Sequence, residues 1–196
     1  MWPHSGRSVG SIPMEQPGKS GEWLVHGERT IYDSEWVRLD MADITVPSGE
    51  RFEHHKVWLP PAAMVLVLDE DESHVLLSYR HRFVSNVWNY ELPGGLLNDD
   101  EPASETAVRE LEEETGYRAR SIEHLVTFEP MIGTVTNPHH VYLARGVEAV
   151  GGVVELDEGK FQWVPVSELR NLVSVGQIVN SGTLVAVLHY LAFNPG

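Results

Sequence analysis

The spacing of apolar residues divides the chain into a tail, a strand-rich segment and a longer mixed region. Residues 1–20 are rich in glycine, serine and proline and have no apolar period, so we predict a disordered tail there. From residue 21, short apolar runs alternate with glycine and aspartate turns. They predict strands at 23–25, 30–32, 36–39, 44–46 and 52–59. We therefore expect a small N-terminal antiparallel β subdomain over residues 21–59. It buries too little to be stable alone.

The apolar pattern changes at Pro60-Pro61, where the second predicted domain begins and continues through residues 60–196. A continuous apolar run at 62–68 is typical of a strand buried on both faces. Further runs predict strands at 75–79, 125–128, 141–143 and 161–164 and helices at 101–115, 167–172 and 183–193. This alternation predicts an α/β fold in which a mixed sheet is flanked by helices.

Composition and charge narrow the function classes. The formal net charge is −15, with 14 Lys and Arg against 29 Asp and Glu. Such a balance argues against binding nucleic acid through its phosphate backbone. No apolar run approaches the ~18 residues that a membrane span needs, so no membrane partner is expected. The absence of cysteine excludes disulfides and thiolate metal sites, and it fits the cytoplasmic localisation that we expect.

Three carboxylates in the first long helix point to metal chemistry. Glu110, Glu113 and Glu114 are spaced at i, i+3 and i+4, which places them within about 100° of arc on one side of a helix. Like charges this close repel one another unless a cation lies among them. Carboxylate oxygens suit Mg²⁺ or Mn²⁺. The alternative is a solvated helix face, which is the commoner role of a short acidic run.

A wider pattern decides against the solvated face. Gly95 is followed after five residues by Glu101 and, after seven more, by the run from Arg109 to Gly116. This spacing resembles the signature of the Nudix superfamily of hydrolases. The resemblance implies an α/β/α sandwich whose signature forms a loop, a helix and a loop.

The resemblance also implies roles for individual residues. Glu110, Glu113 and Glu114 would bind the divalent metals, Mg²⁺ or Mn²⁺, together with the carbonyl of Gly94. Arg109 would orient the carboxylates, and Glu101 would support the metal site. The implied reaction is attack by a metal-activated water on a pyrophosphate phosphorus.

The segment before the signature resembles the ADP-ribose pyrophosphatase group. It carries Arg80 and Arg82 at a strand end, then Trp88 and the run Glu91-Leu-Pro-Gly-Gly95. The likeness implies hydrolysis of ADP-ribose to AMP and ribose 5-phosphate by a homodimer built through residues 21–59. Arg82 is the candidate phosphate-binding arginine, with a plain surface arginine as the alternative. A proline usual in this group is replaced by Ile132.

Two residues compete for the role of general base. Glu110 lies in the metal-binding arc, where a cation would depress its pKa. Glu158 lies in a predicted loop between glycines and would approach only when substrate is bound. We therefore expect Glu158 to be the base. For the aromatic residues of the N-terminal segment, core packing is expected ahead of base stacking: Trp23, Trp36, Phe52 and Trp58.

Alternative functions remain open at this point. In the first alternative, the substrate is a nucleoside diphosphate sugar other than ADP-ribose. In the second, the chain is a nucleoside triphosphate pyrophosphohydrolase. A third alternative is a nucleotide sensor without catalysis. The complete signature and the lack of a basic helix-turn-helix segment argue against the sensor. The N-terminal subdomain argues against the triphosphate enzyme, for which a minimal domain would suffice.

Overall fold

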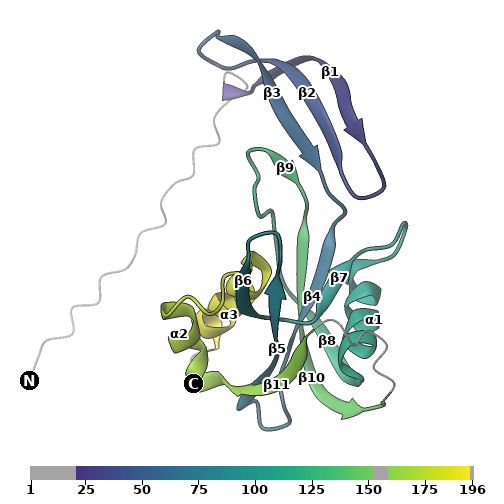
Figure 1. The fold of residues 1–196 in the computed structure, drawn as a ribbon, viewed down its shortest axis with the longest axis vertical. Coiled ribbons are helices and arrows are strands. Elements are labelled where there is room, and N and C mark those ends of the chain that lie inside the picture. The colour runs from purple at the N-terminus through teal and green to yellow at the C-terminus, as the bar shows by residue number, and fades with distance from the viewer. Residues whose placement is uncertain (1–20, 152–158, 195–196) are drawn as a thin grey trace, which may run out of the picture.

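The computed structural model describes residues 21–151 and 159–194. A sheet projects from one end of a body that contains the other strands and all three helices (Figure 1). The predicted tail at residues 1–20 and the predicted base Glu158 lie outside the described residues. In the described ranges, no helix is long and apolar enough to cross a membrane.

The projecting sheet has the order β1-β2-β3-β9, and its first three strands pair antiparallel. Its strands are β1 (Leu24–Asp33), β2 (Arg38–Thr45), β3 (Arg51–Trp58) and β9 (Val135–Thr136). The predicted antiparallel strands are present, but the runs at 23–25 and 30–32 form one strand, with register shifts between Val25 and Gly27 and between Thr30 and Tyr32. Buried and less buried residues alternate along β2, but one of the buried residues is a carboxylate, so the apolar pattern of the sequence does not show the alternation. Asp40 is fully buried, and it accepts hydrogen bonds from Thr30, Arg38 and Trp58.

The body contains two further sheets, which a bridge between Leu68 and Val75 connects. The first has the order β7-β4-β10-β8, and β4 pairs parallel with β10 and antiparallel with β7. The second has the order β11-β5-β6. The strands are β4 (Ala62–Val67), β5 (His74–Arg82), β6 (Val87–Glu91), β7 (Gly94–Leu96), β8 (Tyr117–Phe128), β10 (His139–Ala149) and β11 (Lys160–Pro165). The prediction of a mixed sheet is confirmed.

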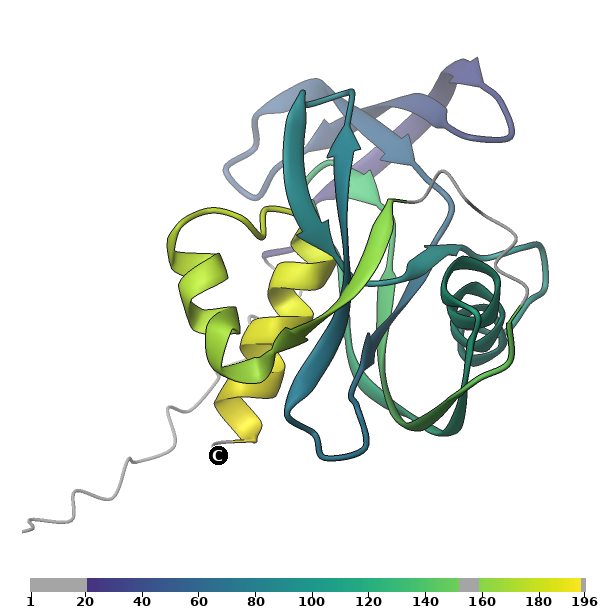
Figure 2. The same cartoon turned by 60° about the horizontal axis from the view of Figure 1, so that its bottom comes forward.

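Helices cover both faces of these sheets (Figure 2). They are α1 (Ala103–Thr115), α2 (Val166–Ser174) and α3 (Ser181–Phe193). Strand β4 is buried throughout, and its alternate residues enter two cores. Ala63 and Val65 pack in the core that α1 covers, whereas Ala62, Met64 and Leu66 pack in the core that α2 and α3 cover. The predicted α/β class and α/β/α sandwich are confirmed.

Local signals fix the position of α1. Pro102 precedes its first residue, and Gly116 ends it in the left-handed conformation at φ 69°, with its N–H donating to the carbonyl of Glu112. The buried side of the helix includes Leu111 as well as Glu110 and Glu114. Helical periodicity therefore turns two carboxylates of the signature inward, toward β7 and β4.

The short strands β6, β7 and β9 were missed by the apolar pattern. β6 carries Asn89 and Glu91 at buried positions, so polar residues interrupt its alternation. β7 contains two glycines and lacks the branched and aromatic residues that favour strands. β9 has only two residues. These strands depend on long-range partners, which a local pattern does not contain.

Candidate active site

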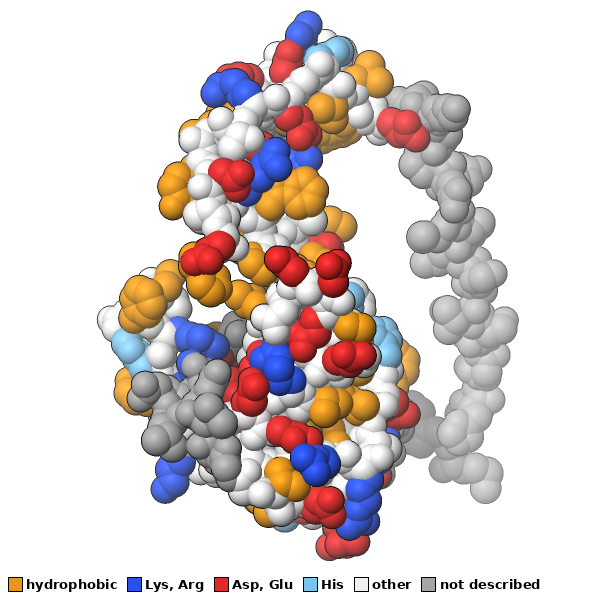
Figure 3. Space-filling model, turned by 90° about the vertical axis from the view of Figure 1, so that its right-hand side faces the viewer, with side chains coloured by type: hydrophobic (Ala, Val, Ile, Leu, Met, Phe, Trp, Pro, Cys, Tyr) orange, Lys and Arg blue, Asp and Glu red, His pale blue; other side chains and the backbone are white. Residues whose placement is uncertain are grey.

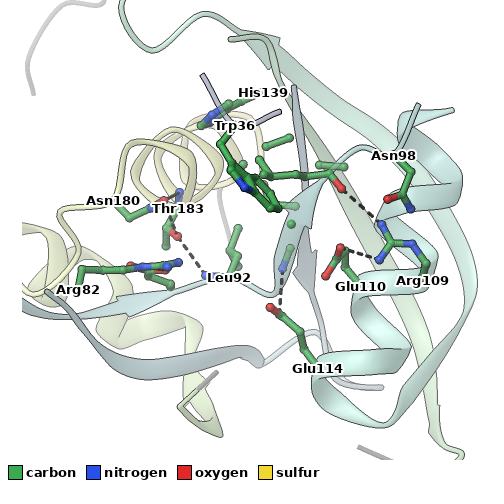
Figure 4. Close-up of a pocket in the computed structure, with 17 residues that line it drawn as sticks. Trp36, Arg82, Leu92, Asn98, Arg109, Glu110, Glu114, His139, Asn180 and Thr183 are labelled. Carbon is green, nitrogen blue, oxygen red and sulfur yellow. Dashed lines mark hydrogen bonds and ion pairs between the residues drawn. The ribbon is translucent and has the colours of Figure 1, made fainter. Parts of the chain in front are cut away.

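One pocket of about 730 Å³ gathers residues from the body and from the projecting sheet. Its volume is in the range of ligand-binding clefts. In Figure 4, Asn98, Arg109 and Glu110 lie on one side, Asn180 and Thr183 lie on the other, and Glu114 lies below them. The charged residues that line the pocket are Arg82, Glu91, Arg109, Glu110 and Glu114. Of the metal ligands predicted from the sequence, Gly94, Glu110 and Glu114 line this pocket, and Glu113 does not.

Two glycines of β7 bring the backbone close to the carboxylates of α1. Gly94 has φ 155°, and a Cβ there would lie 2.4 Å from the carbonyl oxygen of Ala63. Its N–H donates to Oε2 of Glu114 over 3.0 Å. A Cβ at Gly95 would lie 2.4 Å from Oε1 of Glu110. At these two glycines, β7 therefore contacts both buried carboxylates of the helix, Glu110 and Glu114.

Gly95→Ala should displace the Glu110 carboxylate without unfolding the protein. The clash is with the end of a flexible side chain, so we expect little change in Tm. Turnover should fall about tenfold or more, since small displacements of reacting groups are costly. Steady-state kinetics and thermal unfolding check this. The matched control is Gly133→Ala, where a Cβ meets nothing within 4 Å. Equal activity of Gly95→Ala and the control would contradict the placement.

Arg109 connects the carboxylates of the signature. Its Nη1 donates to Glu110 over 2.8 Å and to Glu113 over 2.9 Å. Its Nε and Nη2 donate to Glu101, and Nη2 also donates to the carbonyl of Leu96. All five N–H donors of the guanidinium are thus used within the protein. The hydrogen bond from Arg109 lowers the pKa of Glu101 to about 2, and the bond to Glu101 is the largest of the causes that raise the pKa of Arg109.

The donor set fits a divalent metal in its chemistry. Glu110 is 7% exposed and Glu114 is 4% exposed. Buried carboxylates need compensating positive charge, and their oxygens are the ligands that hard cations prefer. Within the described residues, no three acidic or histidine side chains converge on one point, because Arg109 lies between Glu110 and Glu113. Binding of a metal would therefore require these side chains to rearrange.

Arg82 lines the pocket but does not stand alone. Its Nε donates to both carboxylate oxygens of Glu91, over 3.0 and 3.1 Å, and its Nη2 donates to Oε2. Asn89 donates to Oε1 of Glu91 over 3.0 Å. The hydrogen bond with Glu91 raises the pKa of Arg82, and the charge of Glu114 acts in the same direction. We predicted no role for Glu91 from the sequence. The feature that could have indicated its pairing with Arg82 is its position nine residues later, in a segment with polar residues.

The projecting sheet contributes one aromatic wall. Trp36, in the turn between β1 and β2, lines the pocket and is 63% exposed. Its ring lies across the middle of the pocket in Figure 4. The expectation that Trp36 packs in a core is wrong. The same expectation is wrong for Trp23, Phe52 and Trp58, which are 54%, 37% and 39% exposed.

The predicted general base Glu158 lies outside the described residues, and so do Glu155 and Asp157, the other carboxylates near it in the sequence. The chain re-enters the described part at Gly159, whose φ is 92°. A Cβ on Gly159 would lie 2.9 Å from Cβ of Arg80 and 3.1 Å from the carbonyl oxygen of Tyr79. Gly159 is therefore seated against β5, the strand that also carries Arg82.

The family is settled by comparison with known sequences. The model of the NUDIX domain matches residues 58–179. The chain belongs to the Nudix family. It is a Nudix hydrolase related to ADP-ribose pyrophosphatases, as the signature and the segment before it implied. The matched range includes all of the pocket-lining residues except Trp36, Asn180 and Thr183.

Individual relatives of this Nudix chain cover most of its length. A Streptomyces rubellomurinus protein, named CMP-5′-(N-acetyl-N-hydroxy-3-aminopropyl)phosphonate hydrolase, is 48% identical over 170 residues, which are 86% of this chain and 82% of the relative. The ADP-ribose pyrophosphatase of Bacillus subtilis is 28% identical over 86% of this chain and 92% of its own. A crystal structure of an ADP compounds hydrolase has the same fold, with a TM-score of 0.74 at 16% identity, over 89% of this chain and 96% of that one.

Proposed function

We propose that the chain hydrolyses the anhydride between a nucleoside 5′-monophosphate and a second phosphorus-bearing group. One observation carries the proposal: the buried carboxylates Glu110 and Glu114 share a pocket with Arg82 and with the exposed ring of Trp36. Water adds to one phosphorus, and the bridging oxygen leaves with the other. The products are a nucleoside monophosphate and a phosphate or phosphonate.

Each part of the pocket has a proposed task. Glu110, Glu113 and Glu114, with the carbonyl of Gly94, hold divalent metal ions, either Mg²⁺ or Mn²⁺. A bound metal supplies an acidified water and neutralises developing charge. Before a metal ion is bound, Arg109 orients Glu101, Glu110 and Glu113 through its hydrogen bonds to their carboxylates. Glu158 takes the proton of the attacking water.

The substrate end of the pocket has its own residues. Arg82 binds a phosphate oxygen of the substrate, because its guanidinium retains donors after pairing with Glu91. Trp36 offers an exposed aromatic face on which a base can stack. Neither residue lies on α1, so the groups that recognise the substrate are separate from the carboxylates of the signature.

Separate observations favour two candidates for the group that is joined to the nucleoside monophosphate. The segment before the signature and the Bacillus subtilis relative favour ADP-ribose. The 48% identity to the Streptomyces relative favours an alkylphosphonate joined to CMP. A nucleoside triphosphate is disfavoured, because its additional negative charge would meet the three carboxylates that line the pocket: Glu91, Glu110 and Glu114.

The decisive experiment is a substrate panel. ADP-ribose, a CMP-alkylphosphonate, GDP-mannose and dGTP are each incubated with the protein and Mg²⁺ or Mn²⁺, and products are identified by mass. We expect ADP-ribose or the CMP-alkylphosphonate to give a kcat/KM at least about tenfold above that of dGTP, releasing AMP or CMP. The faster of the two identifies the second group. A tenfold preference for dGTP would overturn the proposal.

The projecting sheet is proposed to form the interface of a homodimer. β1 is an edge strand of ten residues, all exposed, and it carries Leu24, Val25, Ile31 and Tyr32. A long exposed edge strand that carries apolar side chains favours pairing with a second chain. Apolar side chains lie among the charged ones on this sheet and at its junction with the body (Figure 3).

Light scattering should therefore give twice the chain mass of 22.0 kDa. Ile31→Lys should shift the population toward monomer, because it places a charge on the apolar edge strand. The control is Val175→Lys, which changes another exposed aliphatic residue, just after α2. A wild-type monomer at micromolar concentration, with full activity, would contradict the dimer.

A further inference from the structure

The Arg82–Glu91 pair differs in burial from the exposed ion pairs of the protein. The Glu91 side chain is 5% exposed, whereas that of Arg82 is 46% exposed and reaches the pocket. Taking a carboxylate out of water is expensive, and a buried ion pair is weak evidence of a stabilising role. A reason for keeping Glu91 must therefore be sought in what it does to Arg82.

The pair has a defined geometry. Glu91 takes the edge of the guanidinium formed by Nε and Nη2, over 3.0, 3.1 and 2.5 Å. A guanidinium has five N–H donors in a rigid fork. Both hydrogens of Nη1 and the second hydrogen of Nη2 have no recorded partner within the described residues. Two of them, one on Nη1 and one on Nη2, form the neighbouring edge of the guanidinium, which matches two oxygens of a phosphate or phosphonate.

Arg82 is the guanidinium of the pocket that has donors to offer. The pocket is lined by two arginines among the described residues, and all five donors of Arg109 are bound by the protein. In this arrangement an anionic group of the substrate finds donors on Arg82, and it finds donors on Arg109 only where the bonds of Arg109 to Glu110 and Glu113 are released. The orientation of one guanidinium then decides how that anion is held.

Asn89 is a second observation on how Glu91 is held: it bonds Glu91 although this leaves one of its own polar atoms without a partner in the described structure. Its side chain is 1% exposed, and its Nδ2 donates to Oε1 of Glu91 over 3.0 Å. A carboxylate only accepts hydrogen bonds, so the amide nitrogen must face it. Oδ1 of Asn89 is then left buried without a partner in the described structure. A buried acceptor without a donor is destabilising, and the bond that it permits is the one that fixes Glu91.

We propose that Glu91 is a positioning residue, which holds one edge of Arg82 so that the other edge presents its donors to the phosphate or phosphonate of the substrate. The inference rests on the proposed function. In this inference, hydrogen bonds connect Asn89 to Glu91 and Glu91 to Arg82, from the interior of the β5–β6 hairpin to the pocket. Glu91 itself touches no reacting atom.

The inference predicts non-additive effects of substitution. Glu91→Gln keeps the shape but turns an amide toward the guanidinium. Arg82→Lys keeps a cation beside Glu91, which protects the fold, but lacks the second edge. Each should lower kcat/KM about tenfold or more. The double variant should be within about threefold of Arg82→Lys alone, because Glu91 acts only through Arg82.

The experiment measures kcat, KM and Tm for the three variants and, with Mg²⁺ present, their affinity for methylenediphosphonate. That probe carries the two phosphorus groups without a base. We expect weaker binding of the probe by Glu91→Gln and by Arg82→Lys. The control is Glu112→Gln, which breaks the pair with Arg118, of the same Nε and Nη2 geometry, outside the pocket. It should bind and turn over as the wild type does.

Two outcomes overturn the inference while leaving the proposed function intact. In one, Glu91→Gln retains wild-type kinetics and probe affinity. In the other, the effects of the two substitutions multiply, which would mean that Glu91 acts independently of Arg82. If the wild type hydrolyses neither ADP-ribose nor the CMP-alkylphosphonate, the proposed function fails first, and the positioning role falls with it.

Discussion

Replacing Glu114 with glutamine should lower kcat by a factor of about 100 or more at saturating Mg²⁺, since metal and electrostatic contributions amount to several kcal/mol. The fold should survive, because the glutamine oxygen can still accept the N–H of Gly94 and one of the like charges on α1 is removed. Kinetics across a Mg²⁺ titration, with calorimetric Mn²⁺ binding, measure the effect.

The control for Glu114→Gln is Glu112→Gln. It removes a carboxylate of the same helix that pairs with Arg118 outside the pocket. If folded Glu114→Gln and Glu112→Gln had equal activity and Mn²⁺ affinity, Glu114 would not be a metal ligand. The carboxylates of α1 would then serve only to anchor Arg109 and the turn at Gly94.

Glu158→Gln should lower kcat by about 10²–10⁴, the range for a lost general base, while metal affinity stays nearly intact. Glu110→Gln should instead weaken metal binding as well as rate. The two residues differ because Glu110 is buried beside Arg109 in the proposed metal site, whereas Glu158 precedes Gly159, which sits against β5.

Both variants are to be compared across a Mg²⁺ titration and across pH. Glu168→Gln, an exposed carboxylate of α2, is the control. Activity of Glu158→Gln within threefold of the wild type would exclude it as the base. Glu110, Glu155 and Asp157 would then be the candidates.

Much of the fold could be predicted because its signals are local. The helix-favouring content of residues 101–115, with Pro102 in the first turn and Gly116 just past the end, predicted α1 to within two residues at its start. The apolar run after Pro61 predicted β4 and its burial on two faces. These features need only the periodicity and the end signals of one element.

The remaining parts depend on partners far away in the sequence. Asp40 occupies an inward position of β2 because Thr30, Arg38 and Trp58 satisfy it, and no local pattern contains that arrangement. The pairing of Glu91 with Arg82 requires the register of the β5–β6 hairpin. Arg109 could be predicted to contact the carboxylates, but not that all of its donors would be used.

The pocket draws its walls from two parts of the structure, the projecting sheet and the body. Trp36 belongs to the projecting sheet, and the carboxylates belong to a helix packed in the body. Substitutions around the β1–β2 turn can therefore remodel the entrance while the residues between Gly95 and Gly116 stay unchanged. In evolutionary terms, the range of accepted compounds and the bond-breaking chemistry can drift at different rates. A match to the signature alone then indicates the type of bond that is cut but does not indicate which group is attached to the nucleotide.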